Sequence, residues 1–137
     1  MNAIRIEIPG APVSKKRPRF FRRGNHVGTY NPQESEESKT MWHIAQAVNG
    51  QKPLGVPVEM HMTFFMPIPS STPKSLQKQM ELSPVPHTKK PDLDNLIKHV
   101  LDAANGVLFV DDRQIHSVTC RKIYSHEPKT RIVVLYE

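Results

Sequence analysis

The sequence predicts a single small α/β domain, residues 1–137, in which helices flank a mixed, largely antiparallel sheet. The length of 137 residues is that of one ordinary domain. Several segments alternate apolar and polar residues with a period of two, which is typical of strands with one buried face. The segment 92–104 instead repeats its apolar residues at helical spacing. Strands and amphipathic helices in so short a chain predict one shared core.

The chain opens with a predicted strand and continues into a strongly basic segment. Ile4, Ile6 and Ile8 alternate with polar residues until a Pro-Gly pair stops the strand. Residues 13–25, VSKKRPRFFRRGN, carry too many cations for a core and predict an exposed loop or ribbon. The cations that we expect to contact phosphates are Lys15, Lys16, Arg17, Arg19, Arg22 and Arg23.

A helix is predicted next, ending at Gly50. Asn31 supplies an N-cap and Pro32 a first helical residue. Acidic residues follow at 34, 36 and 37, where the helix dipole stabilises negative charge. The expected apolar stripe consists of Met41, Ile44, Ala45 and Val48.

Residues 56–66 alternate again and predict a second strand. A proline-rich stretch ends it, and Ser71 or Thr72 is expected to cap a short helix that begins at Pro73. The connection from there to Pro91 holds further prolines and predicts a flexible or partner-ordered segment. The residues on the buried face of the strand are Val58, Met60, Met62, Phe64 and Met66.

Residues 92–104 give the clearest helix signal in the chain. Its apolar positions follow an i, i+3, i+4, i+7 pattern, and Asn105 with Gly106 ends it. These apolar positions are Leu93, Leu96, Ile97, Val100, Leu101 and Ala104. The remaining predicted elements are a short strand at 107–110, a strand at 114–124, a turn at 126–129 and a last strand at 131–136.

Charge and composition restrict the partners and the compartment. Nineteen Lys and Arg against thirteen Asp and Glu give a net charge of +6, which favours a polyanionic partner such as nucleic acid. One cysteine, Cys120, excludes an internal disulfide and paired-cysteine zinc sites, as in a reduced cytoplasmic protein. No apolar run approaches the roughly 20 residues that span a bilayer, so we expect no membrane partner. The modest apolar content favours burial of further surface in a homodimer.

Charged residues line the polar face of the helix at 92–104. Asp94, Lys98 and Asp102 follow one another at i, i+4 steps, and Asp92 stands at the helix start. Taken singly, these residues have ordinary explanations: an N-cap, a first-turn acid and an exposed ion pair. Asp102 is expected to order Lys98.

Asp111 and Asp112 add two acids after the short apolar segment, where a simple turn is the ordinary explanation. A basic protein that gathers carboxylates where phosphates should bind needs a cation between them. Magnesium resolves this conflict, because it takes hard oxygen ligands and bridges to a substrate phosphate. The combined pattern therefore favours a metal-assisted reaction on a phosphodiester.

Residues 89–115, KKPDLDNLIKHVLDAANGVLFVDDRQI, resemble the signature of the RusA-type Holliday junction resolvases. The family pattern is D-x-D-N-x-x-K, an amphipathic helix with a further Asp, and an apolar strand that ends in D-D-x-Q. Residues 1–88 match more loosely, through an opening strand, a basic loop at 10–19 and a helix. The family's catalytic positions fall on Asp92, Asp94, Lys98 and Asp112.

The resemblance implies a homodimeric endodeoxyribonuclease that resolves four-way DNA junctions by paired symmetric nicks in recombination and repair. Asp92, Asp94 and Asp112 would hold Mg²⁺, for which Mn²⁺ would substitute. Asp112 is preferred to its neighbour because Gln114 follows it at the family spacing. Lys98 would stabilise charge on the scissile phosphate or position the water. Lys89 and Lys90 would join the basic segment in binding branched DNA.

Two other functions stay open at this point. A non-catalytic basic DNA-binding module is the main alternative, and a phosphatase acting on small phosphoesters is more distant. A pure DNA binder gains nothing from three acids beside its DNA, so the carboxylates favour the nuclease. Trp42 is expected to pack in the core, and Cys120 is expected to be buried and inert.

Overall fold

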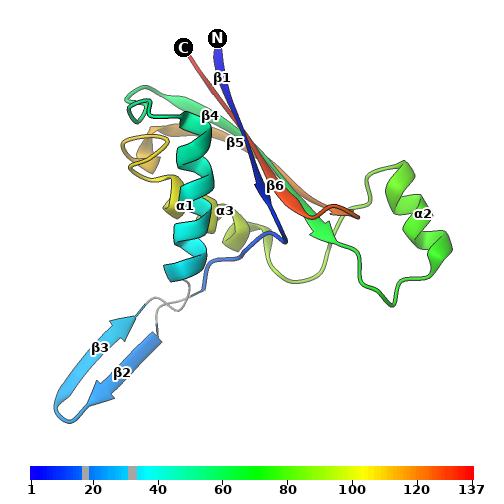
Figure 1. The fold of residues 1–137 in the computed structure, drawn as a ribbon, viewed down its shortest axis with the longest axis horizontal. Coiled ribbons are helices and arrows are strands. Elements are labelled where there is room, and N and C mark those ends of the chain that lie inside the picture. The colour runs from blue at the N-terminus through cyan, green and yellow to red at the C-terminus, as the bar shows by residue number, and fades with distance from the viewer. Residues whose placement is uncertain (17–18, 31–33) are drawn as a thin grey trace.

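The computed structural model describes residues 1–16, 19–30 and 34–137. The elements are β1 (Asn2–Pro9), β2 (Arg19–Arg23), β3 (His26–Tyr30), α1 (Glu34–Val48), β4 (Val58–Pro67), α2 (Lys74–Leu82), α3 (Leu93–Ala104), the 3-10 turn η1 (Asp112–Gln114), β5 (Ile115–Ser125) and β6 (Lys129–Tyr136). Figure 1 shows one sheet against which α1 and α3 lie, with the β2–β3 hairpin and α2 extending away on opposite sides. No helix in the described ranges is long and apolar enough to cross a membrane.

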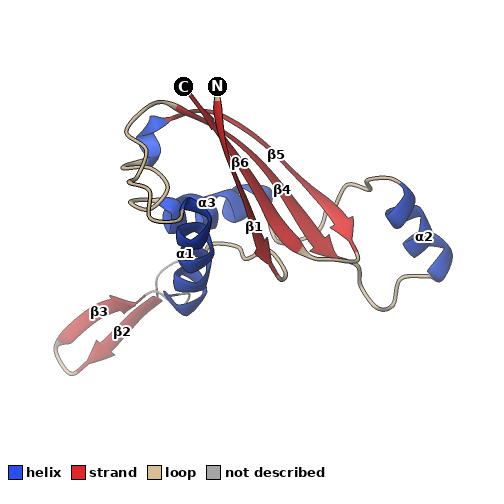
Figure 2. Cartoon of the chain, turned by 45° about the horizontal axis from the view of Figure 1, so that its top comes forward, coloured by secondary structure: helices blue, strands red, loops and turns tan. Residues whose placement is uncertain are grey.

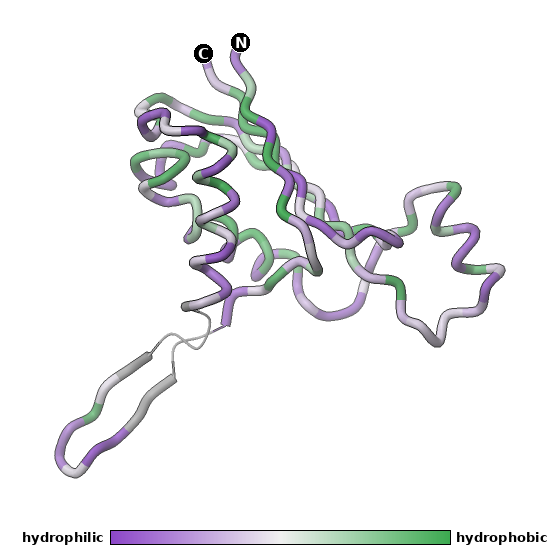
Figure 3. The backbone as a smooth tube through the Cα atoms, in the orientation of Figure 1, coloured by the Kyte–Doolittle hydropathy of each residue, from purple (hydrophilic) through white to green (hydrophobic). Residues whose placement is uncertain are grey.

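The sheet has the strand order β1–β6–β4–β5 and is mixed, as predicted. β6 pairs antiparallel with β1 and with β4, whereas β4 and β5 run parallel. The register aligns Ile6 with Ile132 and Ile132 with Met62, and all three side chains are buried. This row faces the helices, because the alternation of each strand sends every second residue to the same side. Figure 3 shows the same alternation of hydrophobic and hydrophilic residues along the strands.

Helix α1 packs on this row through Ile44 and Val48 of the predicted stripe, with Thr40 in place of Met41. Thr40, Ile44 and Val48 are buried at i, i+4, i+8 spacing. Met41 and Trp42 are 38% and 58% exposed, so their predicted core positions are wrong. Successive residues of an α-helix are rotated by about 100°, so Met41 and Trp42 point away from the interface that Thr40 faces. The predicted N-cap and first residue at 31–32 lie outside the described residues.

Helix α3 fits its predicted bounds and closes the core. Leu96, Val100 and Ala104 are buried against the sheet. His99 is also buried, and its Nε2 lies 2.9 Å from the hydroxyl of Thr40 on α1. Burial lowers the pKa of His99. This hydrogen bond joins α1 to α3 across the buried layer.

The basic segment forms a hairpin, in agreement with the predicted ribbon. Arg23 pairs with His26 in an antiparallel ladder, and Figure 2 shows both strands apart from the main sheet. Helix α2 also protrudes and buries no residue of its own. Its N-cap is Pro73, and no side chain caps it, so the predicted cap at Ser71 or Thr72 is wrong.

The connection between α2 and α3 follows the edge of β5. Tyr124 N donates to the carbonyl of Val85, and His87 N donates to the carbonyl of Lys122, both at 3.1 Å. A single antiparallel bridge between Pro86 and Ile123 lies between these two bonds. The long proline-rich connection therefore has defined backbone partners on the sheet.

The predicted strand at 107–110 is wrong, because these residues form a turn. The amides of Val107 and Leu108 donate to the carbonyl of Ala104, and Gly106 adopts φ 81°. This reversal buries Leu108 and Phe109 under the end of the helix. A run of four apolar residues suits a strand and a buried turn equally, and the left-handed glycine decides between them.

Phe109 is therefore expected to be a principal anchor of this end of the core. We predict that Phe109→Ala lowers the free energy of unfolding by about 3–5 kcal/mol, because it opens a cavity among residues that cannot collapse fully. Leu82→Ala is the control: Leu82 is 84% exposed on the protruding α2, so the change should stay within about 0.5 kcal/mol. Urea denaturation of both variants measures the difference, and equal losses would contradict the buried-turn assignment.

Candidate active site

Two carboxylates stand at the N-terminus of α3. Asp92 is the N-cap residue with extended backbone angles, and its carbonyl accepts the first helical bond from Leu96 N at 3.2 Å. Its side chain makes no capping hydrogen bond, so the carboxylate of Asp92 does not cap the helix. Asp94 follows in the first turn, and its Oδ1 accepts from Asn95 N at 3.0 Å. Both acids are exposed to solvent.

An open hollow of about 420 Å³ lies beside Asp92. Its lining includes Ser14, Lys90 and Asn95, which come from three different segments. The carbonyl of Asn95 accepts a hydrogen bond from Lys15 N at 2.9 Å. The base of the basic segment is thus attached to the first turn of α3, next to the two carboxylates.

The ammonium of Lys15 points into the domain. Its Nζ lies 2.9 Å from Glu37 Oε1 on α1 and 3.1 Å from Asp102 Oδ2 on α3. The hydrogen bond to Glu37 raises the pKa of Lys15 and outweighs the opposing effect of burial, and the bond to Asp102 adds a smaller increase. Asp102 thus pairs with Lys15, and its expected partnership with Lys98 is wrong. Lys98 is exposed and forms no ion pair in the part of the chain that the structure describes.

Asp111 and Asp112 have different surroundings. Asp111 Oδ1 accepts from Arg113 N at 3.0 Å, and Gln114 Oε1 accepts from Asp111 N at 2.8 Å, which together form a capping box. The bond from Arg113 N lowers the pKa of Asp111. Gln114 also donates through its amide to the carbonyls of Leu54 and Val56 at 2.7 and 2.9 Å. Asp111 therefore builds the turn, while Asp112 is exposed and takes no part in the box.

Asp112 lies at the opposite end of α3 from Asp92 and Asp94. The 12 residues of α3 span about 18 Å at the usual helical rise. β5 returns along the helix, from Ile115 beside η1 to Lys122, whose side chain reaches residues 89 and 91. Among the described residues no group of three or more His, Cys, Asp or Glu is placed to hold a metal ion. One chain therefore brings Asp92 and Asp94 together but does not bring Asp112 to them.

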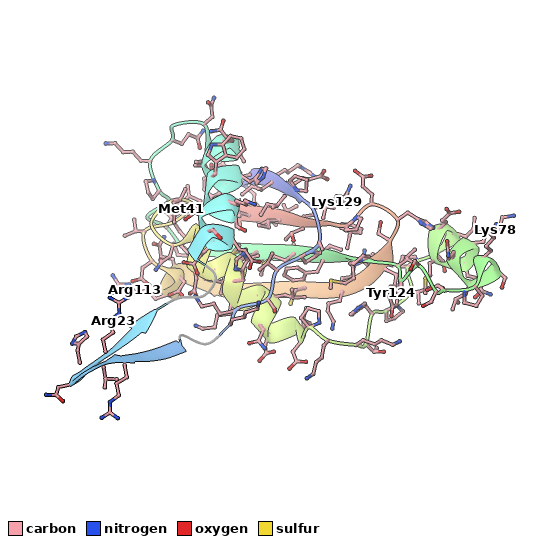
Figure 4. The ribbon with its side chains drawn as sticks, turned by 60° about the horizontal axis from the view of Figure 1, so that its bottom comes forward. Arg23, Met41, Lys78, Arg113, Tyr124 and Lys129 are labelled. Carbon is pink, nitrogen blue, oxygen red and sulfur yellow. The ribbon has the colours of Figure 1, made fainter. Side chains whose placement is uncertain are left out.

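The other expected DNA-binding cations that the structure describes lie in three places. Arg22 and Arg23 are exposed on the hairpin, and Figure 4 shows Arg23 well away from the sheet. Lys89 and Lys90 are exposed just before Asp92. Lys16 is exposed at the base of the hairpin. Arg17 lies outside the described residues, and nothing is described of the Arg19 side chain.

Lys122 is a residue of this region that sequence reasoning missed. Its Nζ donates to the carbonyls of Lys89 and Pro91, both at 2.7 Å. A signal for it was present: β5 alternates, and Lys122 is paired in register with the buried Phe64 of β4. A lysine on the inward face of a strand requires acceptors nearby. Cys120, on the same face, is half-buried rather than fully buried, and burial raises the pKa of its thiol.

The two-layer α/β fold thus places a pair of exposed acids at the start of α3, with the base of the basic segment attached beside them. A family model described as endodeoxyribonuclease RusA matches residues 9–135. The uncharacterized protein YqaN of Bacillus subtilis (strain 168) is 31% identical over 139 residues, covering 98% of this chain and 96% of YqaN. The chain belongs to the RusA endodeoxyribonuclease family.

Gln114 is expected to hold Asp112 in place through the three hydrogen bonds of its side chain. We predict that Gln114→Ala lowers the free energy of unfolding by about 1.5–4.5 kcal/mol, since each of the three lost bonds contributes about 0.5–1.5 kcal/mol. Arg113→Ala removes an exposed neighbouring side chain and should change stability by less than about 0.5 kcal/mol. Thermal and urea unfolding of the two variants test this, and a stable Gln114→Ala protein would mean that η1 is held by other contacts.

Proposed function

We propose that this protein is a magnesium-dependent endodeoxyribonuclease that resolves four-way DNA junctions by paired symmetric nicks, in recombination and repair in the cytoplasm. Membership of the RusA family supports endonuclease activity on Holliday junctions. The observation that carries the proposal is the exposed Asp92–Asp94 pair, which starts the D-x-D-N-x-x-K segment at the N-terminus of α3.

The donor chemistry of this pair suits a hard divalent cation. Both side chains offer carboxylate oxygens, and Asp92 spends none of its side-chain oxygens on capping the helix. Magnesium commonly binds one or two carboxylates and completes its shell with water and substrate phosphate. When bound, it would neutralise phosphoryl oxygens and lower the pKa of a bound water. Mn²⁺ is expected to substitute, because it favours the same oxygen ligands.

The third acid is proposed to come from a second copy of the chain. In one chain, α3 separates Asp112 from the other two acids, so a three-carboxylate site within that chain is incomplete. Exposed apolar side chains flank Asp112: Val110 is 59% exposed and Val56 is 38% exposed. Apolar surface of this kind is typical of a protein interface. A two-fold dimer that covers it would give two sites, each with Asp92 and Asp94 from one chain and the partner's Asp112.

The remaining polar residues have roles that follow from their positions. Lys98 lies one helical turn beyond Asp94 on the same face, and its ammonium is proposed to stabilise charge on the scissile phosphate or to position the water. The cations that we propose to contact DNA phosphates are Lys16, Arg17, Arg19, Arg22, Arg23, Lys89 and Lys90. Lys15 is attached to Glu37 and Asp102, so its larger contribution is expected to be to the geometry at the base of the hairpin.

Incubation with a synthetic four-way junction and with linear duplex, with and without Mg²⁺, tests the proposal. We expect the junction to be cleaved only with Mg²⁺ or Mn²⁺, and Asp94→Asn to lose several orders of magnitude in cleavage while retaining junction affinity in EDTA. Removal of one carboxylate relieves repulsion of the phosphate, so binding should not weaken. Cleavage in excess chelator would contradict metal dependence. Tight junction binding without cleavage under any metal would favour the non-catalytic DNA-binding module.

A subunit-mixing experiment tests the shared site. Asp92→Asn and Asp112→Asn chains are each expected to be inactive alone. When equal amounts are unfolded and refolded together, half of the dimers are mixed, and each mixed dimer regains one site with all three carboxylates. A quarter of all sites are then complete, so the mixture should nick junctions at about a quarter of the wild-type rate at the same total protein concentration. No recovery in the mixture, with mixed dimers confirmed by differential tags, would place all three acids in one chain.

A further inference from the structure

Lys122 lies on β5 at a position that faces the helices. The β4–β5 register pairs it with Phe64, which is fully buried. A charged group in such a row is costly to desolvate unless its donors find acceptors. The ammonium of Lys122 finds two main-chain carbonyls, those of Lys89 and Pro91, at 2.7 Å each. Its charge forms no ion pair with a carboxylate in the described part of the chain.

The main chain around Lys122 also forms hydrogen bonds with the connection between α2 and α3. The carbonyl of Lys122 accepts from His87 N at 3.1 Å, and the rings of His87 and Tyr124 lie 4.8 Å apart. Burial lowers the pKa of His87, and the positive charge of Lys122 lowers it further. Figure 4 shows Tyr124 at the end of the sheet from which the connection to α3 leaves. Residues 85–91 are therefore fastened to β5 by backbone and by side chain.

This fastening ends one residue before Asp92. Pro91 supplies the last carbonyl that Lys122 holds, and the carbonyl of Asp92 already belongs to α3. Many helices fix their first residue through an N-cap side chain, but the side chain of Asp92 makes no such bond. The start of α3 is thus held from outside the helix, which leaves the Asp92 carboxylate unused by the fold.

We infer that Lys122 is a positioning residue for the Asp92–Asp94 pair. It fixes the backbone that enters α3, so that both carboxylates keep the spacing that a divalent cation and a DNA phosphate require. The two hydrogen bonds are charge-assisted and therefore stronger than bonds from a neutral donor. The effect on catalysis rests on the proposed function, whereas the effect on residues 85–95 does not.

Hydrogen exchange in the full-length protein, without metal or DNA, tests the structural part. In Lys122→Met, which keeps the aliphatic stem and removes the donors, amides of residues 85–95 should exchange about tenfold faster or more. Lys122→Arg should restore most of the protection, because the guanidinium fork also offers several donors. Lys78→Met, on the protruding α2, is the control and should leave exchange in residues 85–95 unchanged.

Binding of Mn²⁺ to the DNA-free protein, measured by calorimetry, tests the functional part. Loss of a group that orients metal ligands commonly costs 10–100-fold in affinity, so the Kd for Mn²⁺ should rise by about that factor in Lys122→Met. In junction cleavage, kcat should fall by a similar factor while KM stays within about twofold. Lys122→Arg should recover both quantities.

The outcomes separate the two claims. Wild-type protein that neither binds Mn²⁺ nor cleaves DNA would contradict the proposed function, and the exchange experiment would still decide the role of Lys122. Wild-type protection of residues 85–95, or a wild-type Kd for Mn²⁺, in folded Lys122→Met would overturn the inference. If Lys122→Met does not fold, Lys122→Gln is measured in the same way. Its neutral amide cannot replace both hydrogen bonds to the carbonyls of Lys89 and Pro91. Unchanged exchange of residues 85–95 in Lys122→Gln would equally overturn the inference.

Discussion

Helix α3 can lie on the sheet in only one rotation, and the candidate site depends on that constraint. Leu96, Val100 and Ala103 must face the strands to complete the core, and His99 must face α1 to reach Thr40. The opposite face then has to carry Asp94 and Lys98 into solvent, while Asp102, which is half-buried, pairs with Lys15. The burial of one face of α3 thus dictates the exposure of its charged face.

The polar contacts around α3 then assign different tasks to similar residues. Lys15 and Lys122 are both basic, yet their ammonium groups are turned toward the fold, one to carboxylates and one to carbonyls. Asp111 and Asp112 are adjacent acids, but only Asp111 is part of a capping box. Lys15, Lys122 and Asp111 are therefore used by the fold. Asp112 stays on the surface, where a nucleic acid can meet it.

The four strands of the main sheet, α1 and α3 were predictable because each repeats its apolar residues with one clear period. The position of the D-x-D-N-x-x-K segment at a helix start was also predictable, because the apolar period of α3 fixes where that helix begins. The turn at 107–110 was not, because four apolar residues hold no period, and the exposure of Met41 was not, because two stripes fit α1 equally well. The inward partners of Lys15 and Asp102 depend on how loop, α1 and α3 pack, which local sequence does not encode.

The separation of the acids along α3 has a further physical consequence. A helix of this length is rigid on the scale of a metal site, so no local adjustment joins Asp112 to Asp92 within one chain. A complete three-carboxylate site, if it forms, requires a second copy, and the apolar residues around Asp112 give that copy a surface to cover. Catalysis would then depend on dimerisation, because only the dimer would contain a complete site.

Anomalous diffraction from crystals soaked in Mn²⁺ tests this account most directly, because it locates the ion and identifies its ligands at once. The account predicts Mn²⁺ bound by carboxylate oxygens of Asp92 and Asp94 from one chain and of the partner's Asp112. An ion held by Asp111 or Asp112 alone, or no ion near the start of α3 at saturating Mn²⁺, would contradict it.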